Sequence, residues 1–166
     1  MDLDDGTKVI MISLDGEQFE LSTKAAMRSQ LVKDSIDESK EDTIEFTANK
    51  VKGNILKKVV EYLEHYKDEE PKEIERPLPS SNFSECVDKW DFDFMDITLD
   101  LIFEILLAAN YLDIKPLLEL SSAKVASILK GKTIEEIKQT FTITNDFTPE
   151  EEQQIIEENK WCMENL

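Results

Sequence analysis

The chain has 166 residues, a length that suits one domain able to bury roughly two-thirds of its unfolded surface. Acidic residues outnumber basic ones by 37 to 19, which gives a net charge of -18, and 40% of the residues are hydrophobic. This charge argues against nucleic acids and anionic membranes as partners, because both are bound by neutralising their phosphates with Lys and Arg.

Composition also sets expectations about the compartment. The segment MDLDDGTKV is acidic and has no apolar run, which predicts no secretory signal. The longest apolar stretch, Leu99–Leu112, carries charged residues and is too short to span a bilayer. Cys86 and Cys162 are far apart and are expected as reduced thiols. We therefore expect a protein of the cytoplasm and nucleus.

The first elements along the chain are predicted strands. Residues 9–14 alternate imperfectly, and the apolar pattern resumes over residues 19–21 after the turn dipeptide Asp15-Gly16. This arrangement indicates a β-hairpin. Thr43–Phe46 is expected to form another short strand.

Helices and a loop fill the middle of the chain. Ser22 or Thr23 is expected to cap a short helix that runs through Leu31. Val51–Tyr66 has apolar residues at helical spacing with charged residues opposite, so it predicts an amphipathic helix. Lys67–Asn82 combines three prolines with dense charge, which predicts a solvated, mobile loop.

The second half is predicted to be helical. One short helix is expected over Asp91–Met95, and Thr98 is expected to cap another that runs to about Leu112. This second helix is apolar on nearly all sides, so it should lie centrally. A third helix should begin near Lys115 and stop at Gly131. Strands followed by helices predict an α+β fold.

Two helices with strong start signals close the chain. Thr133 and Thr148 each precede a glutamate at the third position of the helix, and this is the capping-box pattern. In the last helix, the apolar stripe around Ile155 lies nearly opposite Trp161 at about 100° per residue. In one interpretation, Trp161 packs on the domain while the stripe faces elsewhere, or the end of the helix frays and Trp161 has no role. In the other, one face of the helix docks on the domain and the other face binds a partner. Tryptophan is enriched at interface hot spots, which favours binding to a partner.

The sequence carries no recognisable catalytic or metal site. His65 is predicted to act structurally, as a cation-capable residue near a helix C-terminus. Asp91, Asp93 and Asp96 are spaced like a calcium loop, but Asp96 stands where glycine is needed and Ile102 where the bidentate glutamate belongs. No enzyme, cofactor or metal ion is predicted.

Several stretches are long and specific enough to indicate a family. They are SLDGEQFEL (Ser13–Leu21), ILKKVVEYLEHYKDE (Ile55–Glu69), AANYLDIKPLL (Ala108–Leu118), VASILKGKTIEEIKQTFTITNDFTPEEE (Val125–Glu152) and ENKWC (Glu158–Cys162). In this order they closely resemble the Skp1 family, the adaptors of SCF ubiquitin ligases. The resemblance covers essentially the whole chain and is weakest over the acidic loop.

The resemblance implies a BTB/POZ-type core over residues 1–131 and a two-helix C-terminal extension over residues 132–166. In this family the core binds a cullin and the extension grips the F-box of interchangeable substrate receptors, without catalysis or cofactor. Asn110 and Tyr111 are implied as cullin contacts. The residues implied to line the F-box surface are Phe103, Val125, Phe141, Ile143, Asn145 and Trp161.

Two prolines deserve separate expectations under this resemblance. Pro116 stands where many members have glycine; it fits a first helical turn, so the fold should persist while the cullin-facing surface differs. Pro149 stands where some protist members carry a hydroxylated and glycosylated proline. From the residues alone, Pro149 is simply a helix-starting proline, so both alternatives stay open.

A second hypothesis places the chain outside the ubiquitin system, as a BTB-like scaffold subunit that associates with itself. An apolar F-box surface without its partner is a candidate for homodimerisation. The capped pair of terminal helices favours the adaptor, because a simple dimerisation module lacks it.

Overall fold

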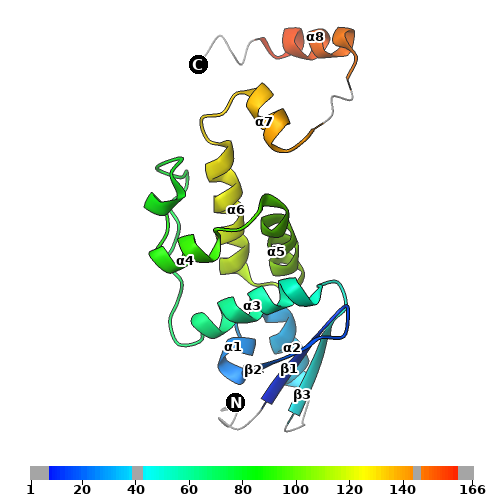
Figure 1. The fold of residues 1–166 in the computed structure, drawn as a ribbon, viewed down its shortest axis with the longest axis vertical. Coiled ribbons are helices and arrows are strands. Elements are labelled where there is room, and N and C mark those ends of the chain that lie inside the picture. Colours follow the sequence, from blue (N-terminus) through cyan, green and yellow to red (C-terminus); the bar gives the residue numbers. More distant parts are fainter. Residues whose placement is uncertain (1–7, 39–42, 144–146, 161–166) are drawn as a thin grey trace. The chain divides into compact units, whose positions relative to one another are not determined.

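The structure, a computed structural model, describes residues 8–38, 43–143 and 147–160. The chain divides into a core unit, Met1–Lys130, and a C-terminal unit, Gly131–Leu166. Among the described residues, all the strands belong to the core unit, and the C-terminal unit contains two helices (Figure 1). The fold is α+β, as the sequence predicts.

A small sheet forms one side of the core unit. Its strands, in the order β2-β1-β3, are β1 Lys8–Ser13, β2 Gln18–Ser22 and β3 Thr43–Ala48. The predicted hairpin is confirmed: β1 and β2 are antiparallel with Val9 opposite Leu21, and Gly16 adopts the positive φ that the turn requires. β3 lies parallel to β1 with Ile44 opposite Val9.

The helix expected from Ser22 to Leu31 is two helices, so that prediction was wrong in its extent. They are α1 Thr23–Ala26 and α2 Gln30–Glu38. Ser22 does cap α1 as predicted. The chain breaks at Ser29, whose buried hydroxyl donates to the Leu112 carbonyl at 2.5 Å and accepts from the Val32 amide. A contact with a distant segment therefore overrides local helix propensity.

Helices α3 to α6 build the rest of the core unit. They are α3 Gly53–His65, the 3-10 turn η1 Phe83–Glu85, α4 Lys89–Phe94, α5 Leu99–Tyr111 and α6 Lys115–Leu129. α3 begins two residues later than predicted, where the Asp15 carboxylate in the hairpin turn accepts from the Gly53 amide at 2.7 Å. α4 begins two residues earlier than predicted.

The hydrophobic core lies where α3 packs between the sheet and α5 (Figure 1). Its largest fully buried side chains include Met11, Leu56, Leu63, Ile102, Ile105, Leu117 and Leu120. α5 is central, as predicted, but it buries only one side. Phe103 and Leu107 on its other side are exposed.

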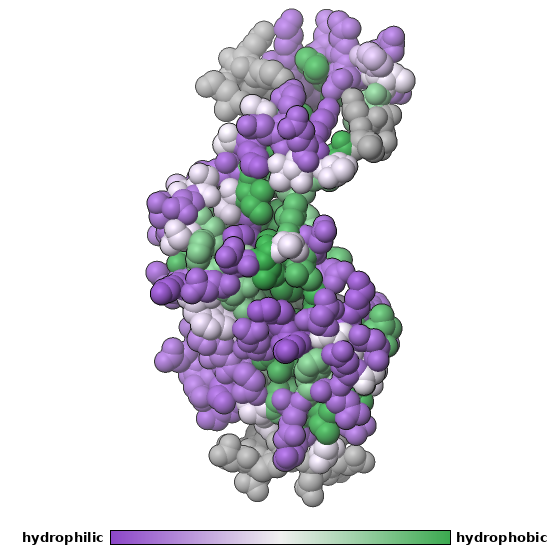
Figure 2. All heavy atoms as spheres, in the orientation of Figure 1, coloured by the Kyte–Doolittle hydropathy of each residue, from purple (hydrophilic) through white to green (hydrophobic). Residues whose placement is uncertain are grey.

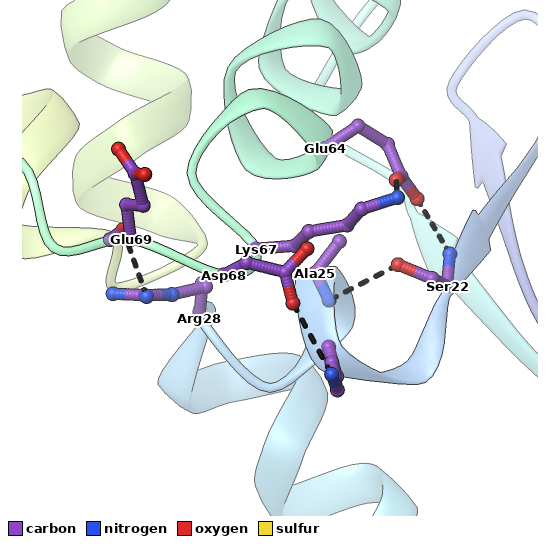
Figure 3. A network of polar contacts seen from close by, with 8 residues as sticks. Ser22, Ala25, Arg28, Glu64, Lys67, Asp68 and Glu69 are labelled. Atoms are coloured by element: carbon purple, nitrogen blue, oxygen red, sulfur yellow. Dashed lines mark hydrogen bonds and ion pairs between the residues drawn. The ribbon is translucent and has the colours of Figure 1, made fainter. Parts of the chain in front are cut away.

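The loop between α3 and η1 is tied to the core unit at its beginning. Lys24 Nζ pairs with Asp68 at 3.1 Å, and the Arg28 guanidinium donates to the Glu69 carbonyl at 3.0 Å (Figure 3). Arg28 also pairs with Glu70 at 2.8 Å. Residues 67–82 contain no helix or strand, as predicted, but they are not wholly solvated, because Ile74 and Leu78 pack against the core.

The helices of the C-terminal unit, in its described part, are α7 Ile134–Thr140 and α8 Pro149–Glu158. Both predicted capping boxes are present, since the Thr133 and Thr148 hydroxyls each accept a helix amide while a glutamate bonds back to the cap. Lys138 Nζ pairs with Glu152 at 3.2 Å across the two helices. Neither helix has a buried residue.

Candidate partner-binding surfaces

The first candidate surface lies at the end of α5. Asn110 is exposed and Tyr111 is half-buried, and the Tyr111 hydroxyl donates to Asn49 Oδ1 at 3.0 Å. Lys50 Nζ lies 5.3 Å from the centre of the Tyr111 ring, within reach of a cation–π contact. Asn49, Lys50, Asn110 and Tyr111 therefore form one surface, here called the α5-end surface.

A tight helix end positions this surface. After α5, Asp113 adopts a positive φ of 49°, and the Ile114 amide reaches back to the Ala109 carbonyl at 2.9 Å. This is the Schellman arrangement, which turns the chain sharply into α6. The sequence identified Asn110 and Tyr111 only through the resemblance. It missed Asn49 and Lys50, because their meeting with α5 leaves no local pattern.

An apolar face runs along α5 toward this surface. Phe103 is 37% exposed and Leu107 is 64% exposed. With Asn110 they stand at i, i+4 and i+7, so the three share one side of the helix. Figure 2 shows hydrophobic side chains gathered over α5 and α6 on this face of the core unit. The structure thus places Phe103, a predicted F-box residue, on the same side of α5 as Asn110, a predicted cullin residue, about two turns away.

Val125 lies on α6 and is half-buried. Leu118 and Ser122 precede it at the spacing of one helical stripe, and both retain some exposure. Lys124, on another side of α6, lies with its Nζ 4.8 Å from the Phe83 ring of η1. One side of α6 is therefore occupied by η1, while the stripe that contains Val125 keeps accessible surface.

The C-terminal unit presents apolar side chains that its own helices do not bury. Phe141 is half-buried and Ile143 is exposed, and both follow α7. Thr142 between them has a φ of 52°, a costly conformation for a β-branched residue. The exposed apolar residues of the described part of this unit are Ile134, Ile143, Phe147, Ile155 and Ile156.

Asn145, Pro149 and Trp161 are the remaining predicted site residues of this unit. Asn145 and Trp161 lie outside the described residues. Pro149 is exposed and is the first residue of α8, directly after the Thr148 cap. This position is accessible, and it equally suits an unmodified helix-starting proline.

His65 and Asp91, which were considered from the sequence for catalysis or metal binding, pack against aromatic side chains or bond to them. The His65 ring stacks on Trp90 with ring centres 3.6 Å apart. Asp91 is buried and accepts a hydrogen bond from the Tyr66 hydroxyl at 2.9 Å. Among the described residues, no cluster of three or more His, Cys, Asp or Glu side chains is arranged to hold a metal ion. No helix in the same residues is long and apolar enough to span a bilayer.

The chain is similar to known proteins along nearly its whole length. Residues 7–68 match the Skp1 family tetramerisation domain, and residues 115–162 match the Skp1 family dimerisation domain. An S-phase kinase-associated protein 1 homolog of Tetrahymena thermophila is 53% identical over 95% of both chains. The E3 ubiquitin ligase complex SCF subunit sconC of Arthroderma benhamiae is 41% identical over 95% of this chain and 96% of its own.

A third relative, the suppressor of kinetochore protein 1 of Schizosaccharomyces pombe, is 41% identical over 94% of this chain and 98% of its own. The two family models cover residues 7–68 of the core unit and residues 115–162, which include both capped helices of the C-terminal unit. The chain belongs to the Skp1 family.

Proposed function

We propose that the chain is a non-catalytic adaptor that links a cullin to F-box substrate receptors in an SCF ubiquitin ligase. One observation carries the proposal: α7 and α8 form with complete capping boxes, yet they bury none of their residues. Most helices are stabilised by packing an apolar face, so two such helices need a partner. The relative named as an SCF subunit supports this assembly.

The adaptor acts by placement. A receptor bound at the C-terminal unit and a cullin bound at the core unit would become parts of one complex. A substrate held by the receptor then meets the ligation machinery at a raised effective concentration. The acidic surface guides encounter with basic partners, while apolar side chains supply the affinity.

In this proposal the two partners bind different surfaces, and the cullin binds the α5-end surface. Tyr111 is held there by its hydrogen bond to Asn49 and by Lys50 over its ring, so it presents a fixed edge to a partner. The F-box surface takes Val125, Phe141, Ile143, Asn145 and Trp161. Phe103 is also assigned to the F-box surface, although it shares a helix face with Asn110. The variant Phe103→Ser tests this assignment, because it should weaken the complex with the F-box and not the complex with the cullin.

Two reciprocal variants test the proposal. Trp161→Ala should weaken F-box binding by about 2 kcal/mol, as for an interface hot spot, and leave cullin binding intact. Tyr111→Lys should weaken cullin binding and leave F-box binding intact. Dissociation constants for each purified partner measure both. Equal loss of both partners in either variant, or no loss, would contradict the division.

The alternative scaffold keeps one observation in its favour, since the exposed apolar residues of the C-terminal unit also suit self-association. We propose that the free protein forms a homodimer through this surface. Sedimentation with and without an F-box domain separates the two functions. Dissociation of the dimer on binding supports the adaptor, whereas a dimer that persists and binds no F-box supports the scaffold.

Modification of Pro149 remains a prediction that rests on the family resemblance. Its exposed position at the start of α8 would admit a modifying enzyme. An added hydroxyl or sugar there would alter the mass of the protein isolated from its native cell. An intact mass equal to that of the unmodified chain would remove the prediction.

A further inference from the structure

A groove of about 810 Å³ lies between the acidic loop and α6, entirely within the core unit. The loop contributes one wall through residues 74–78, and α6 contributes the other. Figure 1 shows the chain between α3 and α4 passing beside α6. We call this the loop–α6 groove. It is not among the surfaces that the sequence predicted.

The loop wall is fixed to α6 at both ends of the groove. Arg76 Nη2 pairs with Glu119 Oε1 at 2.6 Å, and Lys130 Nζ donates to the Leu78 carbonyl. Glu119 and Lys130 stand about three helical turns apart on α6. The rim charges of Arg76, Glu119 and Lys130 are therefore engaged within the chain, and they hold the loop along the helix.

The interior of the groove is apolar. Ile74, Pro77 and Leu78 face it from the loop, and Leu118, Ala123 and Ala126 face it from α6. Three turns of apolar wall suit a row of side chains from another polypeptide. Leu118 and Ser122 line this groove and also belong to the α6 stripe that ends at Val125. The groove thus continues the surface assigned to the F-box.

The negative charge of the loop wall favours some polypeptides over others as occupants of the groove. Glu75 lines the groove and forms no ion pair with the described residues. A second copy of this chain, with its net charge of -18, would meet the acidic loop wall unfavourably at this groove, whereas the apolar residues proposed for self-association lie on the C-terminal unit. A partner with a basic residue beside its apolar side chains is favoured instead.

We propose that the loop–α6 groove receives apolar side chains of an F-box receptor, with a basic receptor residue facing Glu75. This inference rests on the proposed adaptor function. It makes the acidic loop a wall of the receptor site, in which Ile74 and Leu78 select among receptors. If the loop served only to keep the protein in solution, it would not need the apolar side chains of Ile74 and Leu78.

The first test removes the loop wall. The double variant Ile74→Ser/Leu78→Ser should raise the dissociation constant for a recombinant F-box domain about tenfold, measured by titration calorimetry with the full chain. Leu14→Ser is the matched control. Leu14 is an apolar residue, 59% exposed in the hairpin turn, so its loss should change the constant by less than about twofold.

The second test fills the groove without loosening the loop. Ala126 is exposed and lines the α6 wall, so Ala126→Phe should leave the fold intact and occupy the space. It should raise the same dissociation constant about tenfold. Glu75→Lys should weaken binding most at low salt, because screening reduces the effect as salt is added. Circular dichroism of each variant checks the fold.

The outcomes distinguish failure of the groove proposal from failure of the adaptor function on which it rests. If the wild-type chain fails to bind the F-box domain, the adaptor function is wrong and this inference falls with it. If the wild type binds but the loop and filling variants bind equally well, only the groove inference is overturned. Loss of self-association in place of F-box affinity would assign the groove to a second copy and would also overturn it.

Discussion

Asp91 is only 5% exposed, although the chain offers acidic residues in abundance at its surface. Burial raises its pKa above the ordinary value of 3.8, and the hydrogen bond from Tyr66 opposes that rise. Burial also raises the pKa of Tyr66, so its hydroxyl keeps the proton that it donates. The folded state therefore binds the Asp91 proton more tightly than the unfolded state does. The contribution of Asp91 to stability falls as the pH rises from 3.8 through the raised pKa of the folded state.

Removing the donor should expose this dependence. Tyr66→Phe should lower the free energy of unfolding at pH 7 by about 1–3 kcal/mol, because a buried carboxylate loses its hydrogen bond. The loss should shrink as the pH falls through the raised pKa of Asp91, which lies above 3.8, because the carboxyl then takes up a proton. Urea unfolding at neutral and acid pH measures both. Tyr111→Phe is the control, since its hydroxyl bonds the exposed Asn49; a loss independent of pH would contradict the account.

Individual residue roles were predictable when their partners are near in sequence. Thr133 and Thr148 cap their helices as expected, because a capping box lies within four residues. Asp15 was predicted only as a turn residue, yet its carboxylate also bonds the Gly53 amide, 38 positions away. Asn49 joins Tyr111 in the same manner. Such partnerships exist only once the fold has formed.

At the scale of elements, periodicity located most helices and strands but not their limits. The helix over Val51–Tyr66 is present, while its first turn is set by the distant hairpin. The helix predicted through Leu31 breaks because Ser29 bonds Leu112. The acidic loop was expected to be solvated from its composition, and only the structure reveals that Ile74 and Leu78 make it one wall of a groove.

The capping box of α8 yields a prediction at this scale. The Thr148 amide and hydroxyl hold the pKa of Glu151 below its ordinary value of 4.5. A depressed pKa means that the box stabilises α8 above that value and loses this effect as pH falls through the folded-state pKa. Thr148→Ala should cost the helix about 1 kcal/mol at pH 7, because one amide loses its acceptor.

Circular dichroism should record this loss as reduced helix content at neutral pH, with a smaller difference from wild type in acid. The core unit should unfold at an unchanged denaturant concentration, because α8 buries no residue. Glu150→Gln changes a first-turn acid with no part in the box, so it is the matched control. An equal effect of Glu150→Gln would assign the stabilisation to general charge rather than to capping.

At the scale of the whole molecule, the chain combines a unit with a buried core and a unit whose described helices bury no residue. The hydrophobic core consists of residues between Val9 and Ala123, and all of them belong to the core unit. α7 and α8 keep their apolar residues exposed. This contrast explains why the second unit was predictable as helices from local caps, while its partner could be suggested only by resemblance.

The core unit should therefore fold without the C-terminal unit. A fragment of residues 1–130 should unfold cooperatively with a free energy within about 1 kcal/mol of the full chain, because the terminal helices contribute no buried side chain. It should retain cullin binding through the α5-end surface and lose most F-box affinity. Urea unfolding and titration with each partner measure these properties. A fragment that is unfolded would make the terminal helices part of the folding unit, and one that binds the F-box at full strength would place the receptor site on the core unit alone.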